Sequence, residues 1–445
     1  MIPKSIAFHH FGCKVNFAEA SALSRQFHDN GFAVKDFHET ADIYVISTCV
    51  VTAVAEKKCR AAIRQAHKIN PDARIAVIGC FSELKPGELS QMEGVDLVLG
   101  HNGKFRLLEE IRERFHEKEE LPTEDYHGGH IPQEISKPNS FVPSFSYGDR
   151  TRSFLKIQDG CDYYCTYCTI PLARGRSRSD TIENAVKNAR EIQANGIREI
   201  VLTGVNIGDF GKHQGETFLQ LIRELDQVEG LERFRISSIE PDLLSNEIIE
   251  FVAASGKFLS HFHIPLQSGC NKTLKAMHRK YNRELYAQRV EHIKKLMPHA
   301  CIAADVIVGF PGETNEDFSE TFAFLEKVNI SYLHVFTYSK RDNTLASKMD
   351  TPVPDIVKKE RSEALHKLSD QKKHRFYEEN SGREVNVLFE SDNSQGFMHG
   401  FSENYIKVKT PFKPELVNTI VKVKLDILDD DGYLANTIFL NNNTL

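Results

Sequence analysis

The sequence lacks any apolar run long enough to cross a membrane as a helix, which argues against an integral membrane protein. Its first residues, MIPKSIAFHHF, also lack the apolar core of a secretory signal peptide. We therefore expect a cytoplasmic protein without a membrane partner. Positive charge is not in excess either. The formal net charge is −6, so the overall charge gives no support for nucleic-acid binding.

The sequence also lacks the even set of cysteines that a disulfide framework needs, because it has nine. Cysteines stay reduced in the cytoplasm. Clustered cysteines in such a protein are more often metal ligands or catalytic groups than structural crosslinks. The positions of the cysteines are therefore the strongest indication of function in this sequence.

The pattern of apolar runs divides the 445 residues into three predicted domains. In the first domain, apolar runs alternate with polar stretches that are compatible with helices. The runs cover 4–11, 42–47, 74–79 and 95–99, and the helical stretches cover 16–30, 52–69 and 103–118. Strands that alternate with helices predict an α/β fold, here a doubly wound parallel sheet in an N-terminal domain over 1–138.

A second alternating series predicts a different arrangement in the middle of the chain. Its expected strands are 153–158, 198–203, 233–238, 260–266, 301–308 and 331–337, with helices between them. About six β-α units predict a partial (β/α)6 barrel in a central domain over 139–375. After Gly382 the apolar period changes to two, which predicts a small antiparallel β-barrel in a C-terminal domain over 376–445.

A compact cysteine motif, Cys161-x3-Cys165-x2-Cys168, directly follows the first strand of the second series. A closed zinc site needs four ligands, and no second C-x2-C or H-x3-H pair lies downstream. A four-iron cluster normally takes four cysteines as well, so one iron would be left open. An iron–sulfur cluster with one open iron fits the motif better than zinc, because a small molecule can chelate that iron.

This motif resembles that of the radical S-adenosylmethionine superfamily, and the resemblance extends over residues 150–340. Tyr167, just before the last cysteine, matches the aromatic residue that is usual there. The resemblance implies a [4Fe-4S] cluster on Cys161, Cys165 and Cys168, with S-adenosylmethionine on the open iron. It also implies reductive cleavage of S-adenosylmethionine to a 5′-deoxyadenosyl radical, which is chemistry of the cofactor.

The rest of the cofactor site is expected at the carboxyl ends of the barrel strands. The stretch LTGVNIG at 202–208 stands where the superfamily has a Gly-Gly-Glu motif, but the Glu is absent. A polar residue that ends a strand is about as often a helix N-cap as a ligand, so these assignments depend on their recurrence at one rim. The predicted cofactor-binding residues are Tyr167, Thr203, Gly204, Asn206, Ser238, Glu240, Gln267, Ser268, Asp305 and Phe310.

Three further cysteines, Cys13, Cys49 and Cys80, each follow an apolar run of the N-terminal series. The carboxyl ends of strands in an open parallel sheet line one crevice, so these thiols should converge. They would make a second three-thiolate site that is again one ligand short. Cys59 and Cys301 are interpreted as structural, and Cys270, which follows the loop after the fourth strand, is either structural, as favoured here, or close to the cofactor.

With both cysteine sets in place, nearly the whole chain resembles the radical S-adenosylmethionine methylthiotransferase family. The stretches GCKVN (12–16) and LKIQDGCDYYCTYCTIPLARGRSRS (155–179) are similar to the branch that acts on threonylcarbamoyladenosine in tRNA, and GFMHGFSENYIKV (396–408) is similar to a TRAM domain. The resemblance implies a second [4Fe-4S] cluster on Cys13, Cys49 and Cys80. It makes all six cysteines catalytic and implies methylthiolation at C2 of the modified adenine beside the anticodon.

The alternatives are methylthiolation of isopentenyladenosine in tRNA or of a ribosomal protein side chain, and a non-catalytic iron–sulfur scaffold or sensor. For a tRNA substrate we expect the basic residues Arg174, Arg176, Arg279 and Lys280 to bind the RNA backbone or the threonyl carboxylate, although such residues are often only a solvated surface. The other expected partners are a flavodoxin- or ferredoxin-like reductant and a sulfur source, and the chain is expected to be a monomer.

Overall fold

The computed structural model describes residues 5–115, 140–148, 150–428, 434–435 and 438–439. The chain divides into two compact units. The first consists of Met1–Tyr147, Gln158–Asp162 and Cys168–Asp180, and the second of Gly148–Ile157, Tyr163–Tyr167 and Thr181–Leu445. Among the described residues, no helix has the length and apolarity needed to cross a membrane. The predicted domain boundary near 138 lies outside the described residues.

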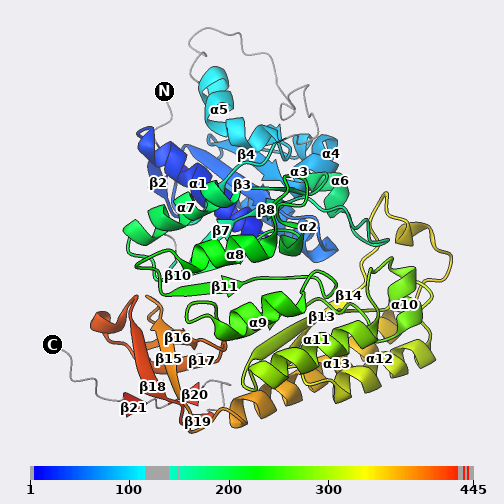
Figure 1. The fold of residues 1–445 in the computed structure, drawn as a ribbon. Coiled ribbons are helices and arrows are strands. Elements are labelled where there is room, and N and C mark those ends of the chain that lie inside the picture. Colours follow the sequence, from blue (N-terminus) through cyan, green and yellow to red (C-terminus); the bar gives the residue numbers. More distant parts are fainter. Residues whose placement is uncertain (1–4, 116–139, 149, 429–433, 436–437, 440–445) are drawn as a thin grey trace. The chain divides into compact units, whose positions relative to one another are not determined.

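A five-stranded parallel sheet, in the order β2-β1-β3-β4-β5, forms the centre of the first unit (Figure 1). Its strands are β1 (Ser5–His10), β2 (Ala33–Lys35), β3 (Ile43–Thr48), β4 (Arg74–Gly79) and β5 (Val95–Leu99). The predicted parallel α/β sheet is therefore confirmed, with the short β2 as an added strand. The strand order reverses between β1 and β3, and ligands of such sheets bind at this switch point.

Helices cover both faces of this sheet. They are α1 (Lys14–Asp29), α2 (Ala53–Ile69), α3 (Cys80–Leu84), α4 (Pro86–Ser90), η1 (Gly103–Arg106) and α5 (Leu107–Phe115). Alternate residues of β3 enter different buried clusters, Tyr44 on the face covered by α2 and Val45 on the face covered by α1 and α5. Burial on both faces explains why the strands are continuous apolar runs in the sequence. The unit also contains β6 (Ser144–Phe145), β8 (Gln158–Asp159), α6 (Ile170–Arg174) and β9 (Arg178–Ser179).

Six parallel strands follow one another in chain order in the second unit. They are β7 (Ser153–Lys156), β10 (Glu199–Thr203), β11 (Arg233–Ile236), β12 (His261–His263), β13 (Cys301–Val308) and β14 (Tyr332–Thr337). Parallel pairings join β7, β10 and β11, and likewise β12, β13 and β14. The parallel bridges Phe234–Phe258 and Ser238–His263 connect the two groups. The predicted second series of β-α units is confirmed.

The connecting helices of this series are α7 (Ile182–Ala194), η2 (Ile207–Asp209), α8 (Phe218–Asp226), α9 (Asn246–Ala254), α10 (Asn271–Ala276), α11 (Arg283–Leu296), α12 (Asn315–Lys327), η3 (Ala346–Lys348) and α13 (Asp355–Glu378). Local capping sets several helix starts: the Thr217 and Thr314 side chains form capping boxes at α8 and α12. Strand β12 is shorter than the predicted 260–266, although the chain continues along β13, where the Ile264 and Leu266 amides donate to the Ala303 and Asp305 carbonyls.

The C-terminal part of the second unit is a mainly antiparallel sheet in the order β19-β20-β17-β16-β15-β18-β21. Its strands are β15 (Glu384–Phe389), β16 (Phe397–Ser402), β17 (Lys407–Pro411), β18 (Ile420–Lys424), β19 (Ile427–Leu428), β20 (Leu434–Ala435) and β21 (Ile438–Phe439), with η4 (Pro414–Leu416) before β18. Val387, Phe389 and Val408 form its core with Phe376 and Tyr377 of α13. Part of the predicted last strand, 432–440, lies outside the described residues.

Candidate functional site with two sets of three cysteines

The loop that carries Cys161, Cys165 and Cys168 connects β8 to α6. Its start has a tight turn at Gly160, where φ is +69° and an added Cβ would lie 2.0 Å from the Arg176 carbonyl oxygen. The Cys161 amide donates a hydrogen bond of 3.1 Å to the Gly175 carbonyl. Only glycine fits at such a turn, so this backbone contact determines where the loop begins.

The thiols of this loop are half-buried, so they could bind a metal that a small molecule can still reach. In the second unit, Arg279 Nη1 lies 3.0 Å from Cys165 Sγ, and burial raises the pKa of Cys165 while Arg279 lowers it. In the first unit, the Ile170 amide at the start of α6 donates to Cys168 Sγ over 3.4 Å. Positive donors beside sulfur favour thiolates, which are the form that binds iron.

Arg279 is the centre of a network in the second unit. It forms an ion pair with Glu240, and its Nε donates to Tyr281 Oη over 3.0 Å. Its side chain is only 3% exposed. Arg279 therefore contacts Cys165 and a carboxylate, while its predicted role as a residue that binds an anionic substrate stays a prediction. A buried guanidinium needs such partners, because leaving it unpaired is costly.

Glu240 keeps its predicted position at the end of β11, next to the Arg279 network. Burial raises the pKa of Glu240 to about 7, against the opposing effect of Arg279, and the charges of Asp242 and Asp305 raise it further. Asp242 also accepts a 2.5 Å hydrogen bond from Tyr163 Oη. The side chains at this rim thus form a connected set of acidic and hydrogen-bonding groups.

Phe310 and Tyr167, two of the predicted cofactor residues, lie in contact with each other. Their ring centroids are 6.5 Å apart, and Phe310 belongs to a buried cluster with Met277 and Ala346. Gly309, with φ of +74°, precedes Phe310, so the β13–α12 connection turns sharply here. The second-unit part of the cysteine loop is therefore packed against the end of β13.

The other predicted cofactor residues have different surroundings in the structure. Thr203 and Gly204 end β10, and Asn206 is buried beside Asp209 with an amide contact of 3.3 Å. Ser238 lies at the end of β11, and the Gln267 amide donates to the Asp305 carbonyl over 2.7 Å. The buried Ser268 hydroxyl contacts Thr321 Oγ1 and accepts from the Cys270 amide, and its predicted binding role stays a prediction.

The structure brings Cys13, Cys49 and Cys80 together at the carboxyl ends of β1, β3 and β4. A Cβ added to Gly12 would lie 2.8 Å from Cys49 Sγ. Burial raises the pKa of Cys49 to about 12, and the charges of Cys80 and Cys13 add to this effect. The first two cysteines flank the point where the strand order reverses, where a doubly wound sheet holds its ligand.

Arg174 reaches into this second cysteine set. Its Nε donates to Cys80 Sγ over 3.2 Å, its Nη1 to Asp159 Oδ1 over 2.9 Å and its Nη2 to Glu19 Oε2 over 3.1 Å. Its side chain is 1% exposed. Arg174 is thus enclosed by carboxylates of its own unit, while its predicted role in binding RNA or the threonyl group stays a prediction.

Sequence reasoning missed the residues that surround Arg174. Lys104 Nζ donates to Glu19 Oε2 over 2.6 Å, and His101 Nε2 lies 3.0 Å from Asp159 Oδ2. Burial lowers the pKa of His101 to about 3, with a further lowering by Lys104. One signal was available, because Asn16 and Glu19 follow Cys13 at spacings that place them on one face of α1.

The two exposed basic residues keep positions that a substrate can reach. Arg176 is 76% exposed and contacts Asp162 in the first unit. Lys280 is exposed in the second unit, with its ammonium 4.0 Å from the centroid of the Tyr163 ring. By contrast, the isolated cysteines are internal: Cys59, Cys270 and Cys301 are all buried.

The N-terminal cysteine set fits a cluster better than a zinc ion. Zinc at about 2.3 Å from each thiolate would hold tetrahedral sulfurs roughly 3.8 Å apart. Among the described residues, Cys13, Cys49 and Cys80 do not form a group with all ligand atoms within 4.8 Å. Three thiolates, with a guanidinium donor to one of them, are a donor set that suits an iron–sulfur cluster with one open iron.

Comparison with known proteins defines the class first. The Radical SAM superfamily model matches residues 155–325, and a model described as Uncharacterized protein family UPF0004 matches residues 5–100. The solved structure of the radical S-adenosylmethionine methyltransferase TsrM from Kitasatospora setae aligns with a TM-score of 0.56 at 14% identity, covering 78% of this chain and 77% of that one. The fold and the cysteine loop are those of a radical S-adenosylmethionine enzyme.

Relatives of known name place the chain within this class. It is 41% identical, over 95% of its length and 93% of the relative, to the threonylcarbamoyladenosine tRNA methylthiotransferase MtaB of Bacillus subtilis, and 38% identical to that of Aquifex aeolicus, over 91% and 96%. A tRNA-2-methylthio-N(6)-dimethylallyladenosine synthase of Pelotomaculum thermopropionicum is 32% identical, over 93% of each chain. The chain belongs to the methylthiotransferase family, in its MtaB-type branch.

Proposed function

We propose that this chain is a tRNA-modifying enzyme that replaces the hydrogen at C2 of N6-threonylcarbamoyladenosine, next to the anticodon, with a methylthio group. The observation that carries this proposal is the 41% identity over nearly the full length to a relative named for that substrate. The two sets of three cysteines support it, because the insertion of sulfur at an unactivated carbon needs both a radical source and a sulfur carrier.

The cofactors are two [4Fe-4S] clusters and S-adenosylmethionine, which supply the radical and the methyl group. Cys161, Cys165 and Cys168 would hold one cluster, and Cys13, Cys49 and Cys80 the other. Overall, the C2–H bond breaks and a C2–S bond forms. The hydrogen leaves in 5′-deoxyadenosine, the methyl group comes from a second S-adenosylmethionine, and sulfur enters at the sulfide level. The single electron that drives the cleavage of S-adenosylmethionine is released again when the C2–S bond forms, so the reaction consumes no net electrons.

The chain's own residues orient and protect this chemistry. Arg279 donates toward Cys165 and holds Glu240, which lies where a hydrogen-bond acceptor for ribose hydroxyls is expected. Phe310 and Tyr167 supply an apolar wall. Tyr167, Thr203, Gly204, Asn206, Ser238, Glu240, Gln267, Asp305 and Phe310 remain the proposed residues for S-adenosylmethionine.

The proposed RNA contacts are now fewer than the sequence suggested. Arg176 and Lys280 are exposed and are the proposed partners of phosphate or the threonyl carboxylate. We further propose a C-terminal TRAM barrel over 376–445 that helps to hold the RNA, beside an N-terminal domain over 1–138 and a radical domain over 139–375. A cytoplasmic monomer, a flavodoxin- or ferredoxin-like reductant and a separate sulfur source complete the proposal.

Substrate choice is tested with three RNAs and one enzyme preparation. Purified holoenzyme, S-adenosylmethionine, reductant and sulfide are mixed with tRNA that carries threonylcarbamoyladenosine without the methylthio group, with tRNA from cells that cannot make threonylcarbamoyladenosine, and with isopentenylated tRNA. We expect the 2-methylthio nucleoside, measured by mass spectrometry, only with the threonylcarbamoyl RNA. If isopentenylated RNA gave an equal amount of product, methylthiolation of isopentenyladenosine, the activity for which the Pelotomaculum relative is named, would be favoured instead. Formation of 5′-deoxyadenosine without any tRNA product would point to a protein substrate.

A further inference from the structure

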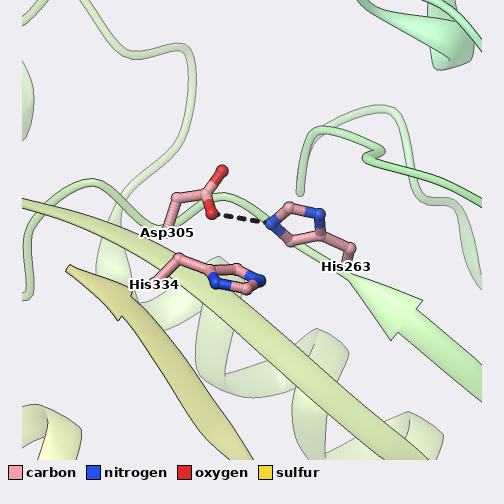
Figure 2. A group of neighbouring side chains, drawn as sticks. All are labelled: His263, Asp305 and His334. Carbon is pink, nitrogen blue, oxygen red and sulfur yellow. Dashed lines mark hydrogen bonds and ion pairs between the residues drawn. The ribbon is translucent and has the colours of Figure 1, made fainter. Parts of the chain in front are cut away.

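A group of three polar side chains lies on three consecutive strands of the second unit, away from both cysteine sets in the sequence. His263 is on β12, Asp305 on β13 and His334 on β14, and Figure 2 shows their side chains directed into one space. The strand register explains this meeting. Asp305 pairs directly with His334, and His263 pairs with Ala303, two residues before Asp305 on the same face of the sheet.

The group lies on the face of the sheet opposite to the one that carries Leu333. Leu333, which alternates with His334 along β14, is buried, and its amide donates to Ser369 of α13. His334, on the opposite face, is exposed, while His263 and Asp305 are each 19% exposed. The three side chains are therefore open to solvent molecules and small ligands.

The distances within the group suit a single ion. His263 Nε2 lies 2.7 Å from Asp305 Oδ1, and one ligand atom from each of the three residues lies within 4.8 Å of the other two. A metal at about 2.1 Å from each ligand holds neighbouring ligand atoms roughly 3.0 to 3.4 Å apart. The His263–Asp305 pair is close to this spacing, and a rotation of the exposed His334 ring completes it.

We propose that His263, Asp305 and His334 bind one divalent transition-metal ion, with Zn²⁺ as the probe, in which case Asp305 serves this ion and not S-adenosylmethionine. Two neutral imidazoles and one carboxylate are a donor set that suits zinc and ferrous ions. They carry one negative charge between them, which offsets part of the charge of the ion. Three protein ligands leave further positions for water or a small oxygen ligand on the exposed side.

A comparison within the chain shows why this group and not another is proposed. Glu19, His101 and Asp159 form a second group with metal-ligand spacing in the described residues. That group is fully buried and already holds Lys104, Arg174 and Arg178 as counter-charges. These cations already neutralise the two carboxylates of that group, so no negative charge remains there to bind a further cation. The group on β12, β13 and β14 is partly exposed, and within it His263 Nε2 and Asp305 Oδ1 share a 2.7 Å hydrogen bond, whose proton a bound metal ion would replace.

Zinc uptake by the holoenzyme tests the proposal. The full chain is first loaded anaerobically with both clusters, so that the six ligand cysteines are occupied, and is then dialysed against micromolar Zn²⁺. Metal analysis should find one zinc per chain. His334→Ala, His263→Ala and Asp305→Asn should each weaken zinc binding at least about tenfold, the size of effect seen even when a partner of a ligand is removed.

The matched control is His366→Ala, which removes an exposed histidine of α13 in the same unit and should leave zinc uptake unchanged. Unchanged iron content shows that each variant retains its fold, and His334→Ala, on an exposed side chain, is the decisive one. The proposal fails if this variant binds zinc as the wild type does, or if the wild type takes up none. It also fails if X-ray absorption at the zinc edge finds sulfur among the ligands.

Discussion

Two buried arginines are the most informative single residues of this protein. Arg174 donates to Cys80 in the first unit, and Arg279 donates to Cys165 in the second. Each is also held by carboxylates, which keep the guanidinium in place. A positive hydrogen-bond donor beside a cluster sulfur stabilises the reduced, more negative cluster and so raises its reduction potential. Both arginines are therefore positioning residues for a cluster.

Replacement of Arg174 by Gln tests this role. We expect a more negative midpoint potential for the N-terminal cluster, measured by redox titration followed by electron paramagnetic resonance, because a cation and a donor are lost. We also expect the free energy of unfolding to fall by about 3–5 kcal/mol, because Glu19 and Asp159 remain buried without their partner. The matched control is Arg176→Gln, two residues away and exposed, which should change neither quantity. An unaltered potential in Arg174→Gln would contradict the role.

The elements of the chain place the cysteines in two different ways. Cys13, Cys49 and Cys80 come from separate strand ends and meet because parallel strands share one edge. Cys161, Cys165 and Cys168 lie on one loop, whose start is held by the β8–β9 pair and by the turn at Gly160. The second arrangement depends on one short piece of backbone, so it should be more sensitive to a local change.

Gly160→Ala tests the importance of this turn. A methyl group there would lie 2.0 Å from a carbonyl oxygen in a left-handed conformation, so the loop must move. We expect loss of the cluster on the loop and of 5′-deoxyadenosine formation, with about four irons kept on the N-terminal cysteines. The control is Gly382→Ala, at φ of +79° with open space around it, which should cost only about 1 kcal/mol of stability. Normal 5′-deoxyadenosine formation in Gly160→Ala would show that the turn is not needed.

For the whole molecule, the two cysteine sets imply a division of labour. Both sets have three cysteines, yet only one lies within the matched Radical SAM region of 155–325. The other lies within the region of 5–100, which a separate family model matches. Two family models on one chain are consistent with the proposal that one module makes the radical and the other carries the sulfur.

The two sets should therefore fail differently when they are replaced by alanine. Loss of Cys161, Cys165 and Cys168 should abolish 5′-deoxyadenosine formation. Loss of Cys13, Cys49 and Cys80 should leave that cleavage measurable while ending methylthio transfer to RNA. Iron analysis should fall from about eight to about four irons per chain in each triple variant. Methylthiolated product from the N-terminal triple variant would refute the assigned role of that module.

The sequence by itself determined the elements and the cysteines. Strand and helix positions follow from apolar periodicity, which is local, and the meeting of Cys13, Cys49 and Cys80 follows from a general rule about parallel sheets. The cysteine loop could be recognised from the sequence because its three cysteines lie within eight residues. The addition of β2 is the kind of detail that periodicity misses, since that strand is short and mostly exposed.

Tertiary structure alone decided which charged side chains face a ligand. Arg174 and Arg279 were expected to be accessible, because sequence shows a charge but not the carboxylate that encloses it. Glu19 lies far from Arg174 along the chain and meets it only after folding. The group of His263, Asp305 and His334 likewise depends on the register of three strands, which a one-residue shift would destroy. Burial and register are properties of packing between distant segments, and no local pattern encodes them.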